Sequence, residues 1–484
     1  MRALPLPVVL VALVALAEAA ARGARARPDD PGPGELFTFD AGDTVEVFDT
    51  ARFRLHFTRD GDHSVPAADT DTSGVPDHVE ALGAIYEAVL DRYLALGFLA
   101  PLGDNGTDAS NDDARFDVYL VDFGLSADGA FTVAGCSGST CFGYMVQEND
   151  FAGYGYPSAS YGNRLLASHE LFHAVQAAYD HEQGQVIGEG TAVWASEQFD
   201  DALDDYEGYA GYFLEETNLA LDATGGAVVS GRTYGSVIFW QFLTERYGDD
   251  TVQRLWAACV DGAGGAADPY WLDAIEGVVG VSFAELFTEF ARWTVYTGDR
   301  ADPSVSFAAG SQLDDVVTTA IELPFTEDSF LVFDAGFQAL RADVDGRAHL
   351  DAAAVGETAD VRLQLFAVGN DGVLEARIVE GARGGIDVGN ADEIWVQVVN
   401  TSRAGGAARP GLCVGDTAEV DACLAELGDE PPPDDVEPTP PSGLGCASAG
   451  PSAPLALALL VMARWRCRRG VTRALLLARS RARP

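Results

Sequence analysis

The chain carries the sequence His169-Glu170-Leu171-Phe172-His173, and Glu189 follows sixteen residues later within Gly188-Glu189-Gly190-Thr191-Ala192-Val193-Trp194. Apolar residues recur near helical spacing from residue 163 to residue 180, without proline or glycine, which predicts a buried helix. Two histidines four residues apart project from one face of a helix and can hold a single metal ion. The stretch therefore predicts a helix and a metal centre on it.

Zinc is the ion that this pattern favours, because zinc binds neutral imidazoles and often one carboxylate. We predict His169, His173 and Glu189 as its ligands. Glu170 follows a ligand directly, so we predict that it takes the proton from the bound water as general base. Glu197 lies two turns beyond Glu189 and is either an acid that orients an imidazole or a solvated helix residue. The alternative for the histidine pair is two core histidines without a metal.

These residues resemble the gluzincin metallopeptidases, which carry HExxH, a spacer, and an acid in an Asn-Glu-Gly or Asn-Glu-Ala context. Gly188-Glu189-Gly190 stands for that second segment. The stretch through Trp194 and Glu197 is similar to a group of uncharacterised secreted bacterial proteins described as metalloproteases. The resemblance implies a peptidase domain with a mixed sheet and a mostly helical lobe, a catalytic zinc ion and a polypeptide substrate.

A third segment, Thr233-Tyr234-Gly235-Ser236-Val237-Ile238-Phe239-Trp240, resembles the tyrosine-led helix of aminopeptidase N-like enzymes. By that likeness Tyr234 stabilises the tetrahedral intermediate, a contribution of about 3 kcal/mol. A packing role is the alternative for Tyr234.

Two departures from the family favour an endopeptidase. The spacer between His173 and Glu189 is shorter than in aminopeptidase N-like enzymes, and no Gly-Ala-Met-Glu-Asn segment is present to bind a free amino terminus. His181 follows His173 by eight residues, which does not fit the metzincin pattern.

The segment 142–147 is predicted either as the edge strand that aligns a peptide substrate or as an ordinary sheet strand.

A loop from residue 69 to residue 80 has the spacing of a calcium-binding loop. Its predicted oxygen donors are Asp69, Asp71, Ser73, the carbonyl of Val75, Asp77 and Glu80. No second such loop exists in the sequence, so we predict a single structural calcium ion. The alternative is an acidic turn that caps the following helix, whose apolar stripe runs from Val79 to Tyr93.

Both ends of the chain predict export. Residues 1–19 read as a signal peptide, with an apolar run and a small-residue cleavage site. A proline-rich acidic linker at 429–445 precedes a tail at 446–484, which has Cys446, an apolar run and an arginine cluster. This order resembles the MYXO-CTERM sorting tail, which leaves a cell-surface anchor at its cysteine. A plain C-terminal membrane segment is the alternative, and either reading puts the protein at the cell surface or outer membrane, or releases it.

Cysteines and charge agree with export. We predict the disulfides Cys136–Cys141 and Cys413–Cys423, with Cys259 buried and unpaired. The net charge of −45, without any lysine, excludes nucleic acid as a natural partner because phosphate would be repelled. Membrane contact is expected only through the C-terminal anchor, and the sequence does not determine the oligomeric state.

The predicted fold class is α+β. Residues 35–300 are expected to form the peptidase domain, with a mixed α/β half at 35–160 that includes the calcium loop and a helical half at 161–300. Alternating apolar residues at 303–425 predict a small β-sandwich as an accessory module. The expected function is a secreted, surface-anchored zinc endopeptidase. The alternatives are a calcium-stabilised adhesion protein whose zinc site is structural or relic, and a zinc amidase that acts on cell-wall peptides.

Overall fold

The computed structural model describes residues 27–29, 37–103, 114–224, 231–370, 372–379, 381–404 and 406–428, which belong to one compact unit. Helices and sheets are both present, so the predicted α+β class is confirmed. The predicted signal peptide (1–19), linker (429–445) and tail (446–484, with Cys446) lie outside the described residues. Within the described residues, every helix is too short or too polar to span a bilayer.

A five-stranded mixed sheet opens the fold, with the strand order β1-β2-β3-β5-β4. Its strands are β1 (Val45–Asp49), β2 (Phe53–Thr58), β3 (Phe116–Val121), β4 (Gly129–Ser137) and β5 (Thr140–Glu148). The inner pairings of β2 with β3 and of β3 with β5 are parallel, whereas β1 and β4 pair antiparallel at the edges. An edge position for the segment 142–147 is therefore wrong, because β4, the first arm of the β4–β5 hairpin, lies outside β5 at the edge of the sheet.

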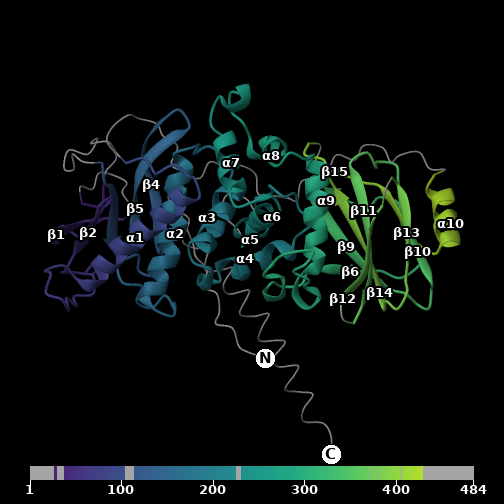
Figure 1. Ribbon diagram of the computed structural model, residues 1–484, viewed down its shortest axis with the longest axis horizontal. Coiled ribbons are helices and arrows are strands. Elements are labelled where there is room, and N and C mark those ends of the chain that lie inside the picture. Colours follow the sequence, from purple (N-terminus) through teal and green to yellow (C-terminus); the bar gives the residue numbers. More distant parts are fainter. Residues whose placement is uncertain are drawn as a thin grey trace, which may run out of the picture. The chain divides into compact units, whose positions relative to one another are not determined.

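Two long helices, α1 (Asp77–Ala95) and α2 (Ala159–Ala177), lie along one face of this sheet (Figure 1). The predicted stripe from Val79 to Tyr93 is buried in the shared core. The helix expected at 163–180 is confirmed as α2, which begins earlier because the Ser158 side chain accepts a hydrogen bond from the backbone N–H of Tyr161 and caps it. The histidine motif therefore lies on a buried helix against the sheet.

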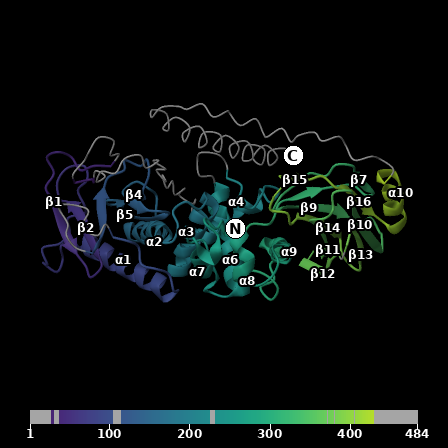
Figure 2. The same ribbon diagram turned by 90° about the horizontal axis from the view of Figure 1, so that it is seen from above.

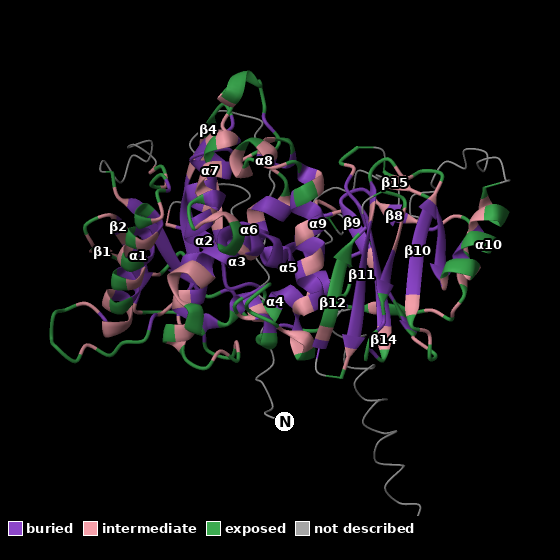
Figure 3. Ribbon diagram, turned by 45° about the vertical axis from the view of Figure 1, so that its right-hand side comes forward, coloured by how far each residue is buried: buried purple, intermediate pink, exposed green. Residues whose placement is uncertain are grey.

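A group of helices follows, in which α3 occupies the centre. They are α3 (Gln185–Phe199), α4 (Asp205–Leu214), α5 (Gly231–Gly235), α6 (Val237–Tyr247), α7 (Thr251–Ala258), α8 (Trp271–Val279) and α9 (Phe283–Trp293). Short 3-10 helices lie at Asp201–Leu203, Ala263–Gly265, Thr294–Tyr296, Gly298–Arg300 and Gly310–Gln312. Nearly every residue of α3 from Val186 to Ser196 is buried, and α3 lies beside α2 (Figures 2 and 3). Burial on all sides fixes the position of α3 relative to α2.

The last part consists of two larger sheets and one helix. The strand orders are β13-β10-β16-β7 and β12-β11-β14-β9-β6, and β8 pairs with β15. The strands are β6 (Thr318–Ala320), β7 (Phe325–Glu327), β8 (Val332–Phe333), β9 (Gly336–Asp343), β10 (His349–Val355), β11 (Val361–Gly369), β12 (Gly372–Ile378), β13 (Arg383–Asp387), β14 (Glu393–Asn400), β15 (Ala407–Ala408) and β16 (Gly411–Gly415). Alternating residues of β11 and β14 share one core with β10 and β16, as period-two patterning predicts. Helix α10 (Thr417–Leu427) follows β16.

The helical part and the strand-rich part share a core. Phe337 of β9 packs against Phe290 of α9 with ring centroids 6.1 Å apart. The buried side chain of Gln397 donates to the carbonyl oxygen of Ala291 over 2.7 Å, and that of Gln364 donates to Thr288 O over 2.9 Å. The domain boundary expected near residue 303 stays a prediction, and a continuous core crosses it.

Both predicted disulfides are present. Cys136–Cys141 closes the tip of the β4–β5 hairpin, and Cys413–Cys423 joins β16 to α10. Cys259 is buried and carries a free thiol, as predicted. The hairpin disulfide therefore holds the two arms of the edge hairpin together beside the face covered by α2.

Candidate metal centre

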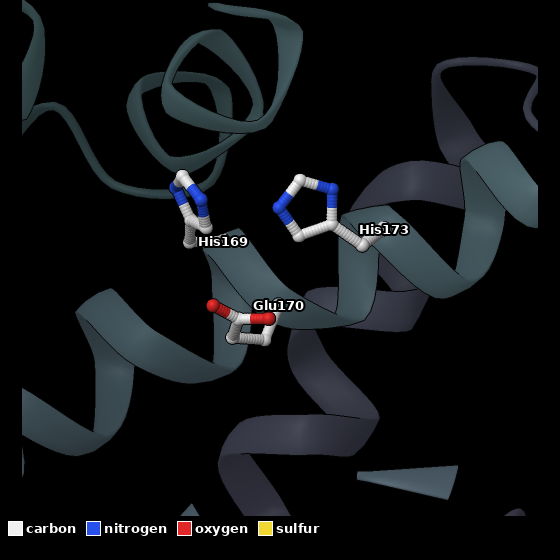
Figure 4. Close-up of side chains that lie close together, drawn as sticks. All are labelled: His169, Glu170 and His173. Carbon is white, nitrogen blue, oxygen red and sulfur yellow. The ribbon is translucent and has the colours of Figure 1, made fainter. Parts of the chain in front are cut away.

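Helix α2 presents two imidazoles on one face (Figure 4). His169 and His173 lie one turn apart, and their ring centroids are 5.0 Å from each other at an interplanar angle of 77°. The side chain of His169 is 0% exposed and that of His173 is 12% exposed. Solvent therefore reaches the pair from the His173 side.

Glu189 completes the group from the neighbouring helix α3. Its Oε2 atom lies 3.2 Å from His169 Nε2 and 3.4 Å from His173 Nε2, and its side chain is 2% exposed. The adjacent Gly190 lets α3 pack closely against Ser236 and Trp240 on its other side, because a Cβ there would lie 2.1 Å from Ser236 Oγ. The structure thus brings together the three residues that the sequence predicts as zinc ligands.

Glu170 lies below the two rings (Figure 4), and one of its ligand atoms is within 4.8 Å of one on each histidine. The backbone N–H of Phe131 in β4 donates to Glu170 Oε2 over 3.0 Å. The other oxygen, Oε1, is buried and has no hydrogen-bond partner. One carboxylate oxygen is thus held by the edge strand, and the other remains available to a ligand.

The electrostatics of the group follow from burial and pairing. Burial opposes the charged form of His173, but the Glu189 carboxylate outweighs it and raises the pKa of His173 to about 9. Burial also opposes ionised Glu189, yet His173 and His169 outweigh it and lower the pKa of Glu189 to about 2. In the metal-free protein the Glu189 carboxylate therefore holds a proton on His173. A divalent ion would displace that proton, since metal ligation requires the neutral ring.

The donor set fits zinc. Glu189 Oε2 lies 3.2 Å from His169 Nε2 and 3.4 Å from His173 Nε2, so two imidazole nitrogens and one carboxylate oxygen lie together. The other nitrogen of the His173 ring, Nδ1, lies 2.9 Å from Gln176 Oε1. Two imidazoles and one carboxylate leave the fourth tetrahedral position for a substrate or solvent molecule, which is the composition of catalytic zinc sites.

Tyr234 lies at the same centre. It belongs to the short helix α5, is 4% exposed, and its ring centroid is 5.9 Å from that of His169. Its ring also stacks on Tyr209 of α4, with centroids 5.0 Å apart. The structure therefore places Tyr234 beside the ligands, where both the predicted oxyanion role and the packing role remain open.

Glu197 lies away from the imidazoles, near other acids. Burial raises the pKa of Glu197 to about 8, and the charges of Glu207 and Asp201 add to that rise. Glu197 Oε2 has no hydrogen-bond partner, and within the described part of the chain no hydrogen bond or ion pair joins it to His169 or His173. Of the two acids on α3, only Glu189 reaches the rings.

Sequence reasoning missed three polar residues around the centre. Gln176 contacts the His173 ring, and its position three residues after His173 on the same helix face was the available signal. Asp128 accepts from the Tyr156 hydroxyl over 2.7 Å, and burial raises the pKa of Asp128 to about 6, with the Glu170 charge contributing. Burial raises the pKa of Asp205 to about 7, a rise that His169 opposes and Asp128 increases. No local pattern marks the two aspartates, which long-range packing brings to the centre.

The predicted calcium loop brings three carboxylates together. Ligand atoms of Asp69, Asp71 and Asp77 lie within 4.8 Å of one another. The backbone N–H groups of Ser73 and Gly74 donate to Asp69 over 3.1 and 3.0 Å. Gly74 adopts a φ of 92°, the conformation that the sixth position of such a loop requires of glycine. Val75 O accepts from the Ser73 hydroxyl, and Glu80 lies in the first turn of α1.

A second acidic group, Asp40, Asp43 and His63, also has ligand atoms within 4.8 Å of one another. The backbone N–H of Asp122 donates to His63 Nδ1 over 2.9 Å. Because Nδ1 accepts this bond, Nε2 carries the proton in the neutral ring and neither nitrogen is free for a metal. This group is therefore a poor metal site.

Comparison with known proteins assigns no family. No protein-family model and no curated protein matches the chain. The chain is similar over 20% of its length to the pre-peptidase C-terminal domain of a collagenase from Bacillus anthracis, at 11% identity, 94% coverage of that chain and a TM-score of 0.16. PliG, a periplasmic inhibitor of g-type lysozyme from Aeromonas hydrophila, matches over 20% of this chain and 96% of its own, at 13% identity and a TM-score of 0.16. TM-scores this low assign neither fold nor function.

Proposed function

We propose that the chain is a zinc endopeptidase that is exported and acts at the cell surface or after release. One observation carries the proposal: Glu189 Oε2 lies between the Nε2 atoms of His169 and His173, while the separate carboxylate of Glu170 has one oxygen without a partner. A structural ion pair would need only the first feature. The unpartnered oxygen of Glu170 supports a hydrolytic role. It is a proton acceptor beside three proposed ligands, and three ligands leave one position of a tetrahedral zinc ion open.

His169, His173 and Glu189 would hold the ion. Bound there, zinc supplies Lewis-acid chemistry, which polarises a carbonyl group and makes water a better nucleophile at neutral pH. Glu170 Oε1 accepts the proton of the attacking water, because it is the unpartnered carboxylate oxygen beside the ligands. The hydrogen bond from Phe131 N to Oε2 fixes the carboxylate in this orientation. The Tyr234 hydroxyl donates to the charge that develops on the carbonyl oxygen.

Strand β4 is the proposed substrate platform. It pairs with β5 on one side, and its Phe131 N–H contacts the general base, so a peptide added along β4 would pass the metal centre. An extended peptide can add to a sheet edge through main-chain hydrogen bonds without a free terminus. This geometry favours cleavage within a chain, and it supports an endopeptidase.

We propose the calcium loop, the accessory domain and the surface anchor as the sequence predicts them. A calcium ion held by the loop from Asp69 to Glu80 would stabilise the start of α1, because three carboxylates close to one another repel when no cation is bound. The strand-rich part, which we propose to be a β-sandwich, carries no assigned ligand and serves to extend the core of the helical part. The gluzincin-like lobe, the export signal and the Cys446 anchor complete the proposal.

The test combines metal analysis with digestion of a peptide library by the full chain. We expect about one zinc ion per chain at the centre, cleavage that a chelator abolishes and zinc restores, and loss of cleavage in Glu170→Gln with zinc retained. Cleavage that survives Glu170→Gln would remove Glu170 from its role. Zinc binding without turnover of any peptide would instead favour the adhesion protein with a structural zinc ion, and cleavage restricted to cell-wall peptides would favour the amidase.

A further inference from the structure

The Gln176 side chain joins the two helices that carry the metal ligands. Its Nε2 donates to Gly188 O of α3 over 2.7 Å and to Thr191 Oγ1 over 3.0 Å, while its Oε1 lies 2.9 Å from His173 Nδ1. Gln176 is 5% exposed and Thr191 is fully buried. The amide thus uses both of its ends between α2 and α3.

The direction of each hydrogen bond is fixed by chemistry. Gly188 O can only accept, so the amide nitrogen of Gln176 must face it. The amide oxygen then faces His173, and His173 Nδ1 must carry the proton that it donates. The lone pair of the neutral ring is left on Nε2, the atom that points at Glu189.

We propose that Gln176 is a positioning residue of the metal centre, which fixes the tautomer and the rotation of His173 and ties the Glu189 helix to it. The inference rests on the proposed zinc site. Gln176 acts through His173 and through the backbone of Gly188, the neighbour of Glu189. A single amide therefore sets the position of two of the three ligands.

The same network extends to a third helix. Thr191 Oγ1 also accepts from Trp256 Nε1 of α7 over 3.2 Å and donates to Ile187 O. Trp256 is 2% exposed, so the arrangement cannot exchange its partners for water. The indole holds Thr191, Thr191 holds the amide of Gln176, and the amide holds His173. This chain of buried contacts gives the ring a single orientation before a metal ion binds.

Two substitutions distinguish the contribution of the amide oxygen, which contacts His173, from that of the amide nitrogen, which contacts Gly188 O. Gln176→Leu removes both ends at similar volume, and Gln176→Glu keeps an acceptor for His173 Nδ1 but loses the donor to Gly188 O. Outer partners of ligating histidines typically change metal affinity roughly 10–100-fold. We expect Gln176→Leu to weaken zinc binding by about that factor and Gln176→Glu to retain tighter binding than Gln176→Leu, as measured by competition with a chromophoric chelator.

Thr244→Val provides the matched control. Thr244 lies on α6 and accepts a buried hydrogen bond over 2.9 Å from Trp194 Nε1 of α3, the helix that carries Glu189. The substitution removes this hydrogen bond without a change at the imidazoles. We expect a lower unfolding temperature in this variant with unchanged zinc affinity. Equal losses of affinity in Thr244→Val and Gln176→Leu would reduce Gln176 to a structural role, and full affinity in Gln176→Leu would remove the role altogether. If the wild-type protein binds no zinc, the proposed function fails first, which is a different result.

The zinc-loaded wild-type protein offers a readout that does not depend on any variant. In nitrogen NMR of its histidine rings we expect His173 bound through Nε2, with an Nδ1–H that exchanges slowly with solvent. Zinc on Nδ1, or an Nδ1–H that exchanges at the rate of an exposed ring, would overturn the inference even if every variant failed to fold.

Discussion

The backbone N–H of Phe131 donates a hydrogen bond to Glu170 Oε2 over 3.0 Å, so the edge strand holds the carboxylate that we propose as general base. Glu170→Asp keeps the charge but shortens the side chain by one methylene. The carboxylate then cannot contact Phe131 and also reach the attacking water. We expect peptide cleavage to fall by about 100-fold or more with zinc content unchanged, measured as kcat alongside metal analysis. Wild-type cleavage in Glu170→Asp would contradict this geometry.

Glu189 and Glu197 lie two turns apart on α3 and form a matched pair. Only Glu189 contacts the imidazoles, so Glu189→Gln should lose most zinc affinity, while Glu197→Gln should bind zinc as the wild type does. Titration with zinc in the presence of a competing chelator measures both. The reverse order of affinities would make Glu197 the ligand.

Tyr234→Phe tests the proposed oxyanion contact. The variant keeps the ring that stacks on Tyr209 and removes only the hydroxyl. We expect kcat to fall about 100- to 1,000-fold with zinc affinity and KM little changed, since the hydroxyl acts on charge that develops in the transition state. Tyr209→Phe is the control, and it should keep its activity. A stability loss without a change in kcat would assign Tyr234 to packing.

The buried carboxyl group of Asp205 should make the free energy of unfolding depend on pH. Burial raises the folded-state pKa of Asp205 from 3.8 to about 7, with Asp128 increasing and His169 opposing the rise. A raised folded pKa contributes stability that is fully present below the unfolded value and is lost as pH rises through the folded value. The metal-free protein should therefore lose stability between about pH 4 and pH 7 through this group. Asp205→Asn should flatten that part of the curve in denaturant unfolding, and an unchanged slope would contradict the burial argument.

Calcium should stabilise the chain through the loop at 69–80. An ion that binds the folded state alone raises the unfolding temperature with its concentration. With zinc present throughout, we expect a calcium-selective chelator to lower the unfolding temperature of the wild type and to leave the double variant Asp69→Asn, Asp71→Asn unaffected. The double variant Asp40→Asn, Asp43→Asn serves as control, because its group is a poor metal site. Equal calcium responses in both double variants would place the ion elsewhere.

Local patterns predicted the elements that carry the site. His169 and His173 share a face because they are four residues apart on one helix, and the alternation in β11 and β14 gave a buried face to each strand. Both disulfides follow from short cysteine spacings that a hairpin and a strand–helix turn can close. The contact of Glu189 with both rings depends on how α3 packs against α2. Glu189 was nevertheless predicted, because Gly188-Glu189-Gly190 resembles the second segment of the gluzincin pattern.

Long-range packing decided what the sequence did not reveal. Whether β4 or β5 forms the sheet edge depends on which arm of the hairpin pairs with β3, and this pairing joins segments that are far apart in the chain. Asp128 and Asp205 come from segments far apart in the chain and meet near His169 only in the folded state. The core that joins Phe337 to Phe290 likewise crosses the boundary near residue 303, where the change to an alternating apolar pattern predicted a new domain.

X-ray absorption and anomalous diffraction on the zinc-loaded full chain test the central claim most directly. We predict zinc at about 2.0–2.2 Å from His169 Nε2, His173 Nε2 and a Glu189 oxygen, with a further position taken by solvent and Glu170 outside the coordination sphere. Zinc held by a different set of side chains, a fourth protein ligand that fills the open position, or no zinc at this centre would contradict the account.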